Sequence, residues 1–249
     1  MHDRTRARAR VATLCLVPLL ACGTAQSSTP EDEPAMEQEA MNALSREEAA
    51  EGFRLLFDGE GLEHWRGFQR DDVPAGWSAT DGTLAFTPGV EGGDLITRET
   101  FADFDLRLEW KLEEGGNSGI FFGVSEDSRR TYHSGPEMQV LDDAGHVDGG
   151  DPRTSAGANY ALHAPSEDVV RPAGEWNEAR IVRQGSHVEH WLNGVKIVEY
   201  EIGSDAWKAL VADSKFAEWP EYGTIHDGHI GLQDHGDRVW YRNLRIKRL

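Results

Sequence analysis

From Gly52 onward, short runs of alternating apolar and polar residues are separated by glycine, aspartate, asparagine and proline, a pattern typical of β-strands and turns. The clearest run is FDLRLEWKL at 104–112, in which every second side chain is apolar and those between are charged. Such a strand buries one face and exposes the other. The other predicted strands are 84–86, 120–124, 138–141, 179–183, 187–192, 195–202, 229–235 and 239–246.

Turns and helices complete the expected fold. Asn193-Gly194 is the strongest short hairpin signal, and Gly236-Asp237 is predicted to turn strand 229–235 back into the last strand. Helical patterns are confined to 46–51, which begins with a capping box, and 206–216. Many short strands without a repeat or an internal linker predict one all-β domain, an antiparallel β-sandwich of the jelly-roll type.

The N-terminus has the layout of a bacterial export signal. Arginines at positions 4, 6, 8 and 10 precede an apolar run, residues 11–21, which is shorter than the ~20 residues needed to span a bilayer. The run ends in LLACG, which resembles the lipobox after which a lipid-bearing cysteine becomes the new N-terminus; that cysteine is Cys22. An ordinary signal peptide, with Cys22 incidental, is the alternative.

These features divide the chain into a lipoprotein signal peptide (1–21), a flexible acidic tether (22–50) and the β domain (51–249). The other cysteine, Cys15, lies within the signal, so the mature domain has no thiol and no disulfide. Acyl chains on Cys22 would hold the protein stably on a membrane. We therefore expect a membrane-anchored lipoprotein of the bacterial cell envelope, facing the periplasm or the exterior.

Charge excludes one large class of partners. Loss of residues 1–21 removes four arginines and Asp3, which leaves 21 basic and 43 acidic side chains and a formal charge of −22. Nucleic acid demands a basic surface, so we expect no nucleic-acid partner. Anionic lipid would also repel the domain, so the predicted membrane link is the lipid anchor alone.

Candidate chemistry begins in the strand that contains EMQVL. Met138 and Val140 must face the core, so Glu137 and Gln139 point together to the opposite face. Retaining glycosidases place two carboxylates ~5–5.5 Å apart, which neighbouring positions on one strand face would suit. Because Gln139 can neither attack nor titrate, a two-carboxylate mechanism within this strand is not expected.

Three nearby segments offer further candidates. In strand 120–124, Phe121 and its flanking glycines face the same side as the groove, where the ring could stack on a sugar, although glycines at a strand bend explain the pattern equally well. His133 lies in the loop before Glu137 and is a candidate base or ligand only because of that neighbour. The acidic loop 142–151 could hold a cation, but a solvated loop is the more typical interpretation.

The segment GHIGLQDHGDRV at 228–239 repeats the pattern. Ile230 and Leu232 mark its core face, so Gln233 and His235 point outward together. A metal site through His235 requires Glu137 or His133 to lie close to it in space.

Several motifs occur together, in order, over nearly all of residues 52–249. They are FRLLFDG (53–59), GNSGIFF (116–122), EMQVLD (137–142), NY (159–160) followed by ALHAP (161–165), GEWN (174–177), WLNG (191–194), GHIGLQDHGD (228–237) and YRNLRI (241–246). Together they resemble the family called domain of unknown function 1080, also described as a 3-keto-disaccharide hydrolase domain. One departure is Asn159, where leucine would be expected before the tyrosine.

The resemblance implies a concanavalin A-like jelly roll that acts on glycosides already oxidised at carbon 3, supplied by a sugar 3-dehydrogenase. The implied reaction is elimination across carbons 1 and 2, followed by hydration, with net hydrolysis. It needs a base, stabilisation of the enolate oxygen and an acid. A divalent cation could serve the oxygen.

On this basis Glu137, His235 and His133 are the candidate catalytic residues. The candidate substrate-binding residues are Gln139, Gln233, Asn117, Phe121 and Trp219. The three amides would hold sugar hydroxyls, and an aromatic ring would stack on the sugar. The alternative is a non-catalytic carbohydrate-binding module, since the jelly roll also serves as a lectin scaffold.

Overall fold

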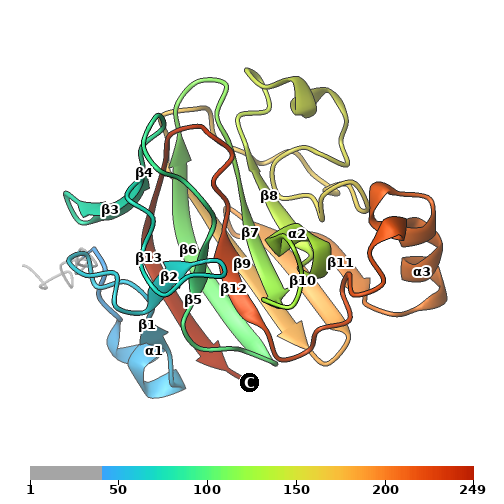
Figure 1. Cartoon of the computed structure of the whole chain (residues 1–249), viewed down its shortest axis with the longest axis horizontal. Helices are drawn as coiled ribbons and strands as arrows, with labels where there is room; N and C mark the ends of the chain where they lie inside the picture. Colours follow the sequence, from blue (N-terminus) through green and yellow to red (C-terminus); the bar gives the residue numbers. More distant parts are fainter. Residues whose placement is uncertain (1–40) are drawn as a thin grey trace, which may run out of the picture. The chain divides into compact units, whose positions relative to one another are not determined.

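Two stacked antiparallel sheets make up the β domain in the computed structural model, which describes residues 41–249 (Figure 1). The larger sheet runs in the order β11 (Val195–Glu201), β10 (His187–Leu192), β9 (Asn177–Gln184), β6 (Phe104–Leu112), β13 (Val239–Arg248), β4 (Thr83–Phe86) and β3 (Trp77–Thr80), with β1 (Arg54–Leu55) paired to β13. The smaller sheet runs in the order β2 (Trp65–Gly67), β5 (Leu95–Thr97), β12 (His229–Leu232), β7 (Asn117–Val124) and β8 (Glu137–Leu141). This arrangement confirms the predicted concanavalin-like β-sandwich.

Residues 41–249 contain five short helical segments, one before β1 and four in the connections between strands. They are α1 (Arg46–Glu51), α2 (Thr131–Ser134), the 3₁₀ turn η1 (Val147–Gly150), α3 (Asp205–Ala212) and the 3₁₀ turn η2 (Lys215–Glu218). None of the helices between residues 41 and 249 is long and apolar enough to cross a membrane.

The core lies between the two sheets and follows the alternation of the sequence. Every apolar residue of β6 is buried, as predicted. Its one buried charge is Asp105, which accepts hydrogen bonds from Arg107 and Arg180 and thereby keeps its ionised form paired. From the smaller sheet, the core receives Ile120, Phe122, Met138, Val140, Ile230 and Leu232. The opposite face of this sheet is therefore free to carry a site.

The turn at Gly236-Asp237 does not close a hairpin, contrary to the prediction. β12 ends at Leu232 and belongs to the smaller sheet, whereas β13 belongs to the larger one. The chain leaves the smaller sheet at Asp234, whose backbone N–H donates to Asp94 and whose carboxylate accepts from Gly93 at 2.7 Å. The segment after β12 thus crosses between the sheets, and Gln233 lies directly after the end of β12.

The predicted helix 206–216 is two separate elements. α3 ends at Ala212, and the Ser214 hydroxyl then accepts a hydrogen bond from the N–H of Phe216 at 3.1 Å, which caps η2. A serine cap starts a new turn more readily than it continues a helix. The break places Lys215 at the beginning of η2.

The ordered domain also begins earlier than the predicted boundary at residue 51. Ser45 caps α1 through the predicted capping box, and Asn42 is buried, where its amide donates to the Gly82 carbonyl at 2.7 Å. Residues 42–50 are therefore part of the sandwich rather than of a tether. The predicted signal peptide, Cys22 and tether residues 22–40 lie outside the described residues.

Candidate active site

A cavity of about 340 Å³ lies on the outward face of the smaller sheet. β7, β8 and the segment after β12 supply five of its wall residues, and the connecting segments supply the others. The wall consists of Asn117, Tyr132, Glu137, Gln139, Asp148, Tyr160, Lys215, Trp219, Gln233 and His235. Six of these were predicted as site residues, and they come from four separate stretches of the chain. The alternation of the strands therefore predicted the face on which this cavity lies.

Glu137 is the strongly perturbed carboxyl group of this cavity. The residue is only 6% exposed, and burial raises its pKa from the ordinary 4.5 to about 8. The Lys215 ammonium and the Gln233 amide act in the opposite direction, whereas Asp94 and Asp148 raise the pKa further. A carboxyl group that titrates near neutral pH can both accept and return a proton, which suits general acid–base catalysis.

Gln139 and Gly119 fix the position of this carboxyl group. The Gln139 amide, oriented with its nitrogen toward them, donates to the Ser118 carbonyl at 3.0 Å and to Glu137 Oε1 at 3.3 Å. Gly119 pairs with Gln139 across β7 and β8, and a Cβ atom there would stand 2.1 Å from Glu137 Oε1. A glycine at this position therefore leaves the space that the carboxylate occupies.

Lys215 brings a positive charge to the same cavity. Its Nζ lies 4.2 Å from the centre of the Tyr160 ring and 6.0 Å from that of Tyr132, within cation–π range. Desolvation lowers the pKa of Lys215, while Glu137 and Asp148 raise it. The cavity thus combines one ammonium group with carboxyl groups and two aromatic faces, in an environment that strengthens electrostatic interactions.

Tyr160 and Asp148 form a second polar pair in the wall. The Tyr160 hydroxyl donates to Asp148 Oδ2 at 3.4 Å, and the Asp148 N–H donates to His146 Nδ1 at 3.1 Å. Burial raises the pKa of Tyr160 to about 12, and the charges of Asp148 and Glu137 add to this effect. The phenol consequently stays protonated at neutral pH and can act as a hydrogen-bond donor.

Two amide side chains offer unused acceptors in the wall. Asn117 Oδ1 and Gln233 Oε1 are buried and have no hydrogen-bond partner among residues 41–249. Buried polar atoms are normally paired, so unpaired ones in a cavity wall are typical of a site that completes its hydrogen bonds with a ligand. His235 lies at the exposed rim, with its Nδ1 at 3.7 Å from Asp237 Oδ2.

His133 was predicted as a catalytic residue, but the structure places it outside the cavity wall. Its ring stacks on Trp219, with the centroids 4.2 Å apart and 14° between the planes. Burial lowers the pKa of His133, so the stacked ring favours the neutral form. Trp219 does line the cavity, as predicted, and His133 therefore supports a wall residue.

Phe121 also lies outside the cavity wall. The alternation correctly assigned it to the face away from the main core, but the side chain is fully buried in a small cluster with Ile96 and Val124. Phe68 and Tyr132 pack against this cluster. The covered ring of Phe121 has no face left for a sugar. The neighbouring Tyr132, in contrast, borders the cavity.

Four wall residues were missed by sequence reasoning, and they come from connections rather than strands: Tyr132, Asp148, Tyr160 and Lys215. Asp148 belongs to the acidic loop that was expected to be solvated. In that loop Asp142 Oδ2 accepts from the Gly115 N–H at 2.7 Å and Asp143 Oδ1 from that of Ala156 at 2.8 Å. These bonds hold the loop against the domain, where η1 can deliver Asp148 to the cavity.

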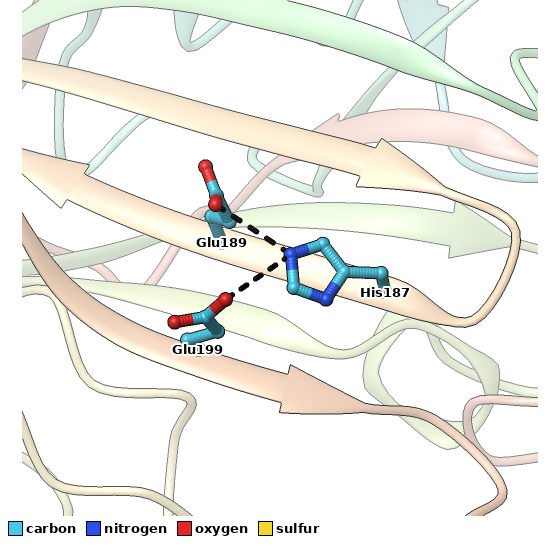
Figure 2. A group of neighbouring side chains, drawn as sticks. All are labelled: His187, Glu189 and Glu199. Carbon is cyan, nitrogen blue, oxygen red and sulfur yellow. Dashed lines mark ion pairs between the residues drawn. The ribbon is translucent and has the colours of Figure 1, made fainter.

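Among residues 41–249, His235, Glu137 and His133 do not form a group whose ligand atoms lie within 4.8 Å of one another. Within the described part of the chain, the three-residue group with its ligand atoms inside 4.8 Å is His187, Glu189 and Glu199, on the surface of β10 and β11 (Figure 2). Lys196 Nζ contacts Glu189 at 3.2 Å and Glu199 at 2.7 Å, so an ammonium group already pairs with both carboxylates. The cluster is explained as a surface ion-pair network.

The comparison with protein families covers nearly the whole domain. Residues 52–247 match the family described as the 3-keto-alpha-glucoside-1,2-lyase-like domain. The chain belongs to this family. It is 35% identical over 237 residues to a 3-keto-disaccharide hydrolase of Bacteroides thetaiotaomicron, in an alignment that covers 83% of this chain and 82% of the relative. The chain is accordingly a hydrolytic enzyme and not a non-catalytic carbohydrate-binding module.

Solved structures agree on the fold. A proposed glycosyl hydrolase from Parabacteroides distasonis superimposes with a TM-score of 0.79 at 33% identity, covering 84% of this chain and all of that one (100%). A second protein of the same description and organism gives a TM-score of 0.62 at 31% identity, with 79% and 99% coverage. Both support the two-sheet architecture described above.

Proposed function

We propose that this enzyme hydrolyses 3-keto-disaccharides by elimination followed by hydration. The observation that carries the proposal is that Glu137, a buried carboxyl group with a pKa of about 8, has the amide Gln139 rather than a second carboxylate as its neighbour on the strand face. That pair suits removal of a proton better than displacement by a carboxylate nucleophile. The family and the curated relative point to the same class of substrate.

The reaction needs one base because the ketone makes the hydrogen on carbon 2 acidic. The base takes this hydrogen as a proton, and the electron pair of the broken C–H bond forms the enolate of the carbon-3 ketone. The enolate then expels the oxygen on carbon 1, which leaves as an alcohol after gaining a proton. Water adds its oxygen to carbon 1 of the resulting glucal and a proton to carbon 2, so the net result is hydrolysis.

We assign the base to Glu137 in its ionised form. Lys215 is the group best suited to stabilise the enolate oxygen, since a fixed ammonium in a desolvated cavity interacts strongly with developing negative charge. Tyr160 stays protonated and can donate a hydrogen bond to the substrate or to the leaving oxygen. Asn117 and Gln233 would hold sugar hydroxyls through their unpaired oxygens.

Asp148 supports a second candidate, an ordinary glycosidase acting on unoxidised sugars. It is a second carboxylate in the same cavity, and such enzymes use two. The Tyr160 hydroxyl already contacts Asp148, however, and this contact favours a supporting role over that of a free nucleophile. The two candidates differ in their need for the ketone.

The test is to incubate the enzyme with 3-keto-trehalose or 3-keto-lactose, and separately with trehalose or lactose, and to measure the released sugar. Release from the oxidised substrates alone is the expected result. Equal release from the unoxidised sugars would replace elimination by the two-carboxylate mechanism. If neither type of substrate reacts, the proposed function is wrong.

We also propose that the enzyme is a lipoprotein of the cell envelope, on the basis of the lipobox-like sequence that ends at Cys22. Its substrate would come from an enzyme that oxidises a sugar hydroxyl at carbon 3, because the ketone must precede the elimination. Labelling of the full chain with radioactive palmitate in a bacterial host should mark the wild type and not Cys22→Ser. Equal labelling of the variant would exclude Cys22 as the site of lipidation.

A further inference from the structure

A second cavity, of about 610 Å³, lies next to the catalytic one and shares a wall with it. Trp219 borders both cavities. The second cavity is enclosed by α3, η2, the turn between β9 and β10 and residues 219–226. Nothing in the reaction described above uses this space. Trp219 is the one lining residue that the two cavities share, so it lies between them.

Flat aromatic rings form much of the inner wall of the second cavity. Phe216 and Tyr222 stack with centroids 4.0 Å apart and 10° between their planes. Trp207 continues the stack on Tyr222 at 5.8 Å and 7°. All three residues are at most 4% exposed, which means that the surrounding elements hold them in place. Together they give the cavity a rigid apolar lining, beside which a flat apolar group can pack.

The charge of the wall is opposite to that of the protein. The chain has a formal charge of −19, yet the residues that line this cavity include arginine, lysine and histidine and no acidic residue. His226 is paired with Asp103 at 3.1 Å, and Lys208 is an exposed rim residue at 4.0 Å from Asp205. Arg183 differs from both because it is only 3% exposed.

Arg183 is a buried cation without an ion pair in the described part of the chain. Its Nη1 donates to the Ile225 carbonyl at 3.0 Å and its Nε to that of Gly185 at 3.4 Å, so its hydrogen bonds go to neutral groups, and the Asp103 charge acts on it from beyond salt-bridge distance. Desolvation consequently lowers the pKa of Arg183. A buried charge without a counter-charge costs free energy, and a bound anion would recover part of it. The Tyr222 hydroxyl in the same wall is also buried and unpaired among residues 41–249.

We propose that this second cavity binds the leaving group of the substrate, and that the preferred leaving group is an aromatic ring that carries a carboxylate. The ring would contact the aromatic wall, the carboxylate would pair with Arg183, and Trp219 would lie at the junction with the keto-sugar. This inference rests on the proposed function, since it assigns the other half of the same substrate. It predicts that 3-keto aryl glycosides are substrates alongside 3-keto-disaccharides.

Binding of a free aromatic acid tests the cavity independently of catalysis. The probe is 4-hydroxybenzoate, and its neutral control is 4-hydroxybenzamide, both titrated into the intact enzyme by calorimetry. A hydrogen-bonded ion pair at a buried site is expected to favour the acid by about tenfold or more. Arg183→Met should remove this preference, and Tyr222→Phe, which keeps the ring and breaks no existing hydrogen bond, should retain it in part. Lys208→Met is the matched control, in which an exposed rim cation is lost with little change in affinity.

Turnover then tests the assignment to the leaving group. The KM values of two substrates, the 3-keto glucosides of 4-hydroxybenzoate and 4-hydroxybenzamide, are measured with the wild type and with Arg183→Met. For each substrate, the KM of the variant is divided by that of the wild type. This ratio cancels any difference in reactivity between the two leaving groups. Arg183→Met is expected to raise the KM for the acid substrate about tenfold and to leave the KM for the amide substrate unchanged. Thermal melts of each variant show whether a loss reflects unfolding, and Tyr222→Phe provides the second variant.

Each outcome separates the two proposals. Equal use of both aryl substrates by the wild type, or a preference for the acid that survives in Arg183→Met, overturns the second cavity as a leaving-group site while hydrolysis of 3-keto sugars stands. No turnover of any 3-keto glycoside overturns the proposed function, and with it the leaving-group assignment, even if the free acid binds.

Discussion

Replacement of Glu137 by Gln should separate its catalytic role from its effect on stability. The side chain keeps its shape and its neighbours, but it can no longer take the proton from carbon 2. Loss of a general base costs about 10² to 10⁴ in rate. We therefore expect kcat on a 3-keto-disaccharide to fall by at least a hundredfold while the variant folds normally.

The effect on stability has the opposite sign. The folded state keeps the Glu137 proton up to a pKa of about 8, whereas the unfolded chain releases it near 4.5. The wild type therefore loses stability as pH rises from about 4.5 to about 8, because ionisation is more favourable in the unfolded state. At 1.36 kcal/mol per pKa unit, the total approaches about 5 kcal/mol. Glu137→Gln lacks this dependence. As pH rises over that range, its free energy of unfolding should therefore increase relative to that of the wild type.

The assay combines turnover with urea denaturation at several pH values. Asp143→Asn is the matched control, since burial raises the pKa of that carboxyl to about 6 but the residue lies outside the catalytic cavity. It should keep its activity. Activity of Glu137→Gln within tenfold of the wild type would remove Glu137 from the mechanism. A constant difference in stability from pH 5 to pH 9 would show that its pKa is not raised.

Three further predictions concern the same cavity. For the wild type, kcat/KM should rise with pH, reach half its maximum near pH 8 and level off above about pH 9, because Glu137 acts ionised; a profile flat from pH 5 to 9 would contradict this. Lys215→Met should lower kcat by about a hundredfold and move the inflection of the pH profile upward, because the ammonium lowers the pKa of Glu137; an unmoved inflection would refute the coupling. Gly119→Ala should displace the Glu137 carboxylate and reduce kcat, whereas Gly150→Ala, which has open space around its Cβ position, should not; equal activity of both would disprove the steric argument.

The sequence predicted the face of the site because strands alternate strictly. Apolar residues at Met138, Val140, Ile230 and Leu232 leave only one direction for Glu137 and Gln233. The same rule could not show that Phe121 is covered, because covering depends on residues far away in the chain. It also could not show that β12 and β13 lie in different sheets, since a turn signal between two strands does not determine which strands pair.

The residues that were missed lie where the chain has no periodicity. Lys215 enters the cavity because Ser214 interrupts a helix and starts a new turn, which is a local event with a weak signal. Asp148 depends on hydrogen bonds between its loop and the backbone of distant segments. His133 was adjacent to Glu137 in sequence, but it lies on α2 and stacks on Trp219. Neighbours in sequence at a strand entrance need not share a cavity.

The central claim is elimination, and the most direct measurement is the fate of the hydrogen on carbon 2. Hydrolysis of a 3-keto-disaccharide in D₂O should place one deuterium on carbon 2 of the released 3-keto sugar, observed by NMR at early times. Free 3-keto-glucose, incubated with and without enzyme, measures exchange that is independent of bond cleavage. Deuterium at carbon 2 in every product molecule, well above that background, is the predicted result. Release of a product that retains its original hydrogen at carbon 2 would show that the glycosidic bond breaks without elimination.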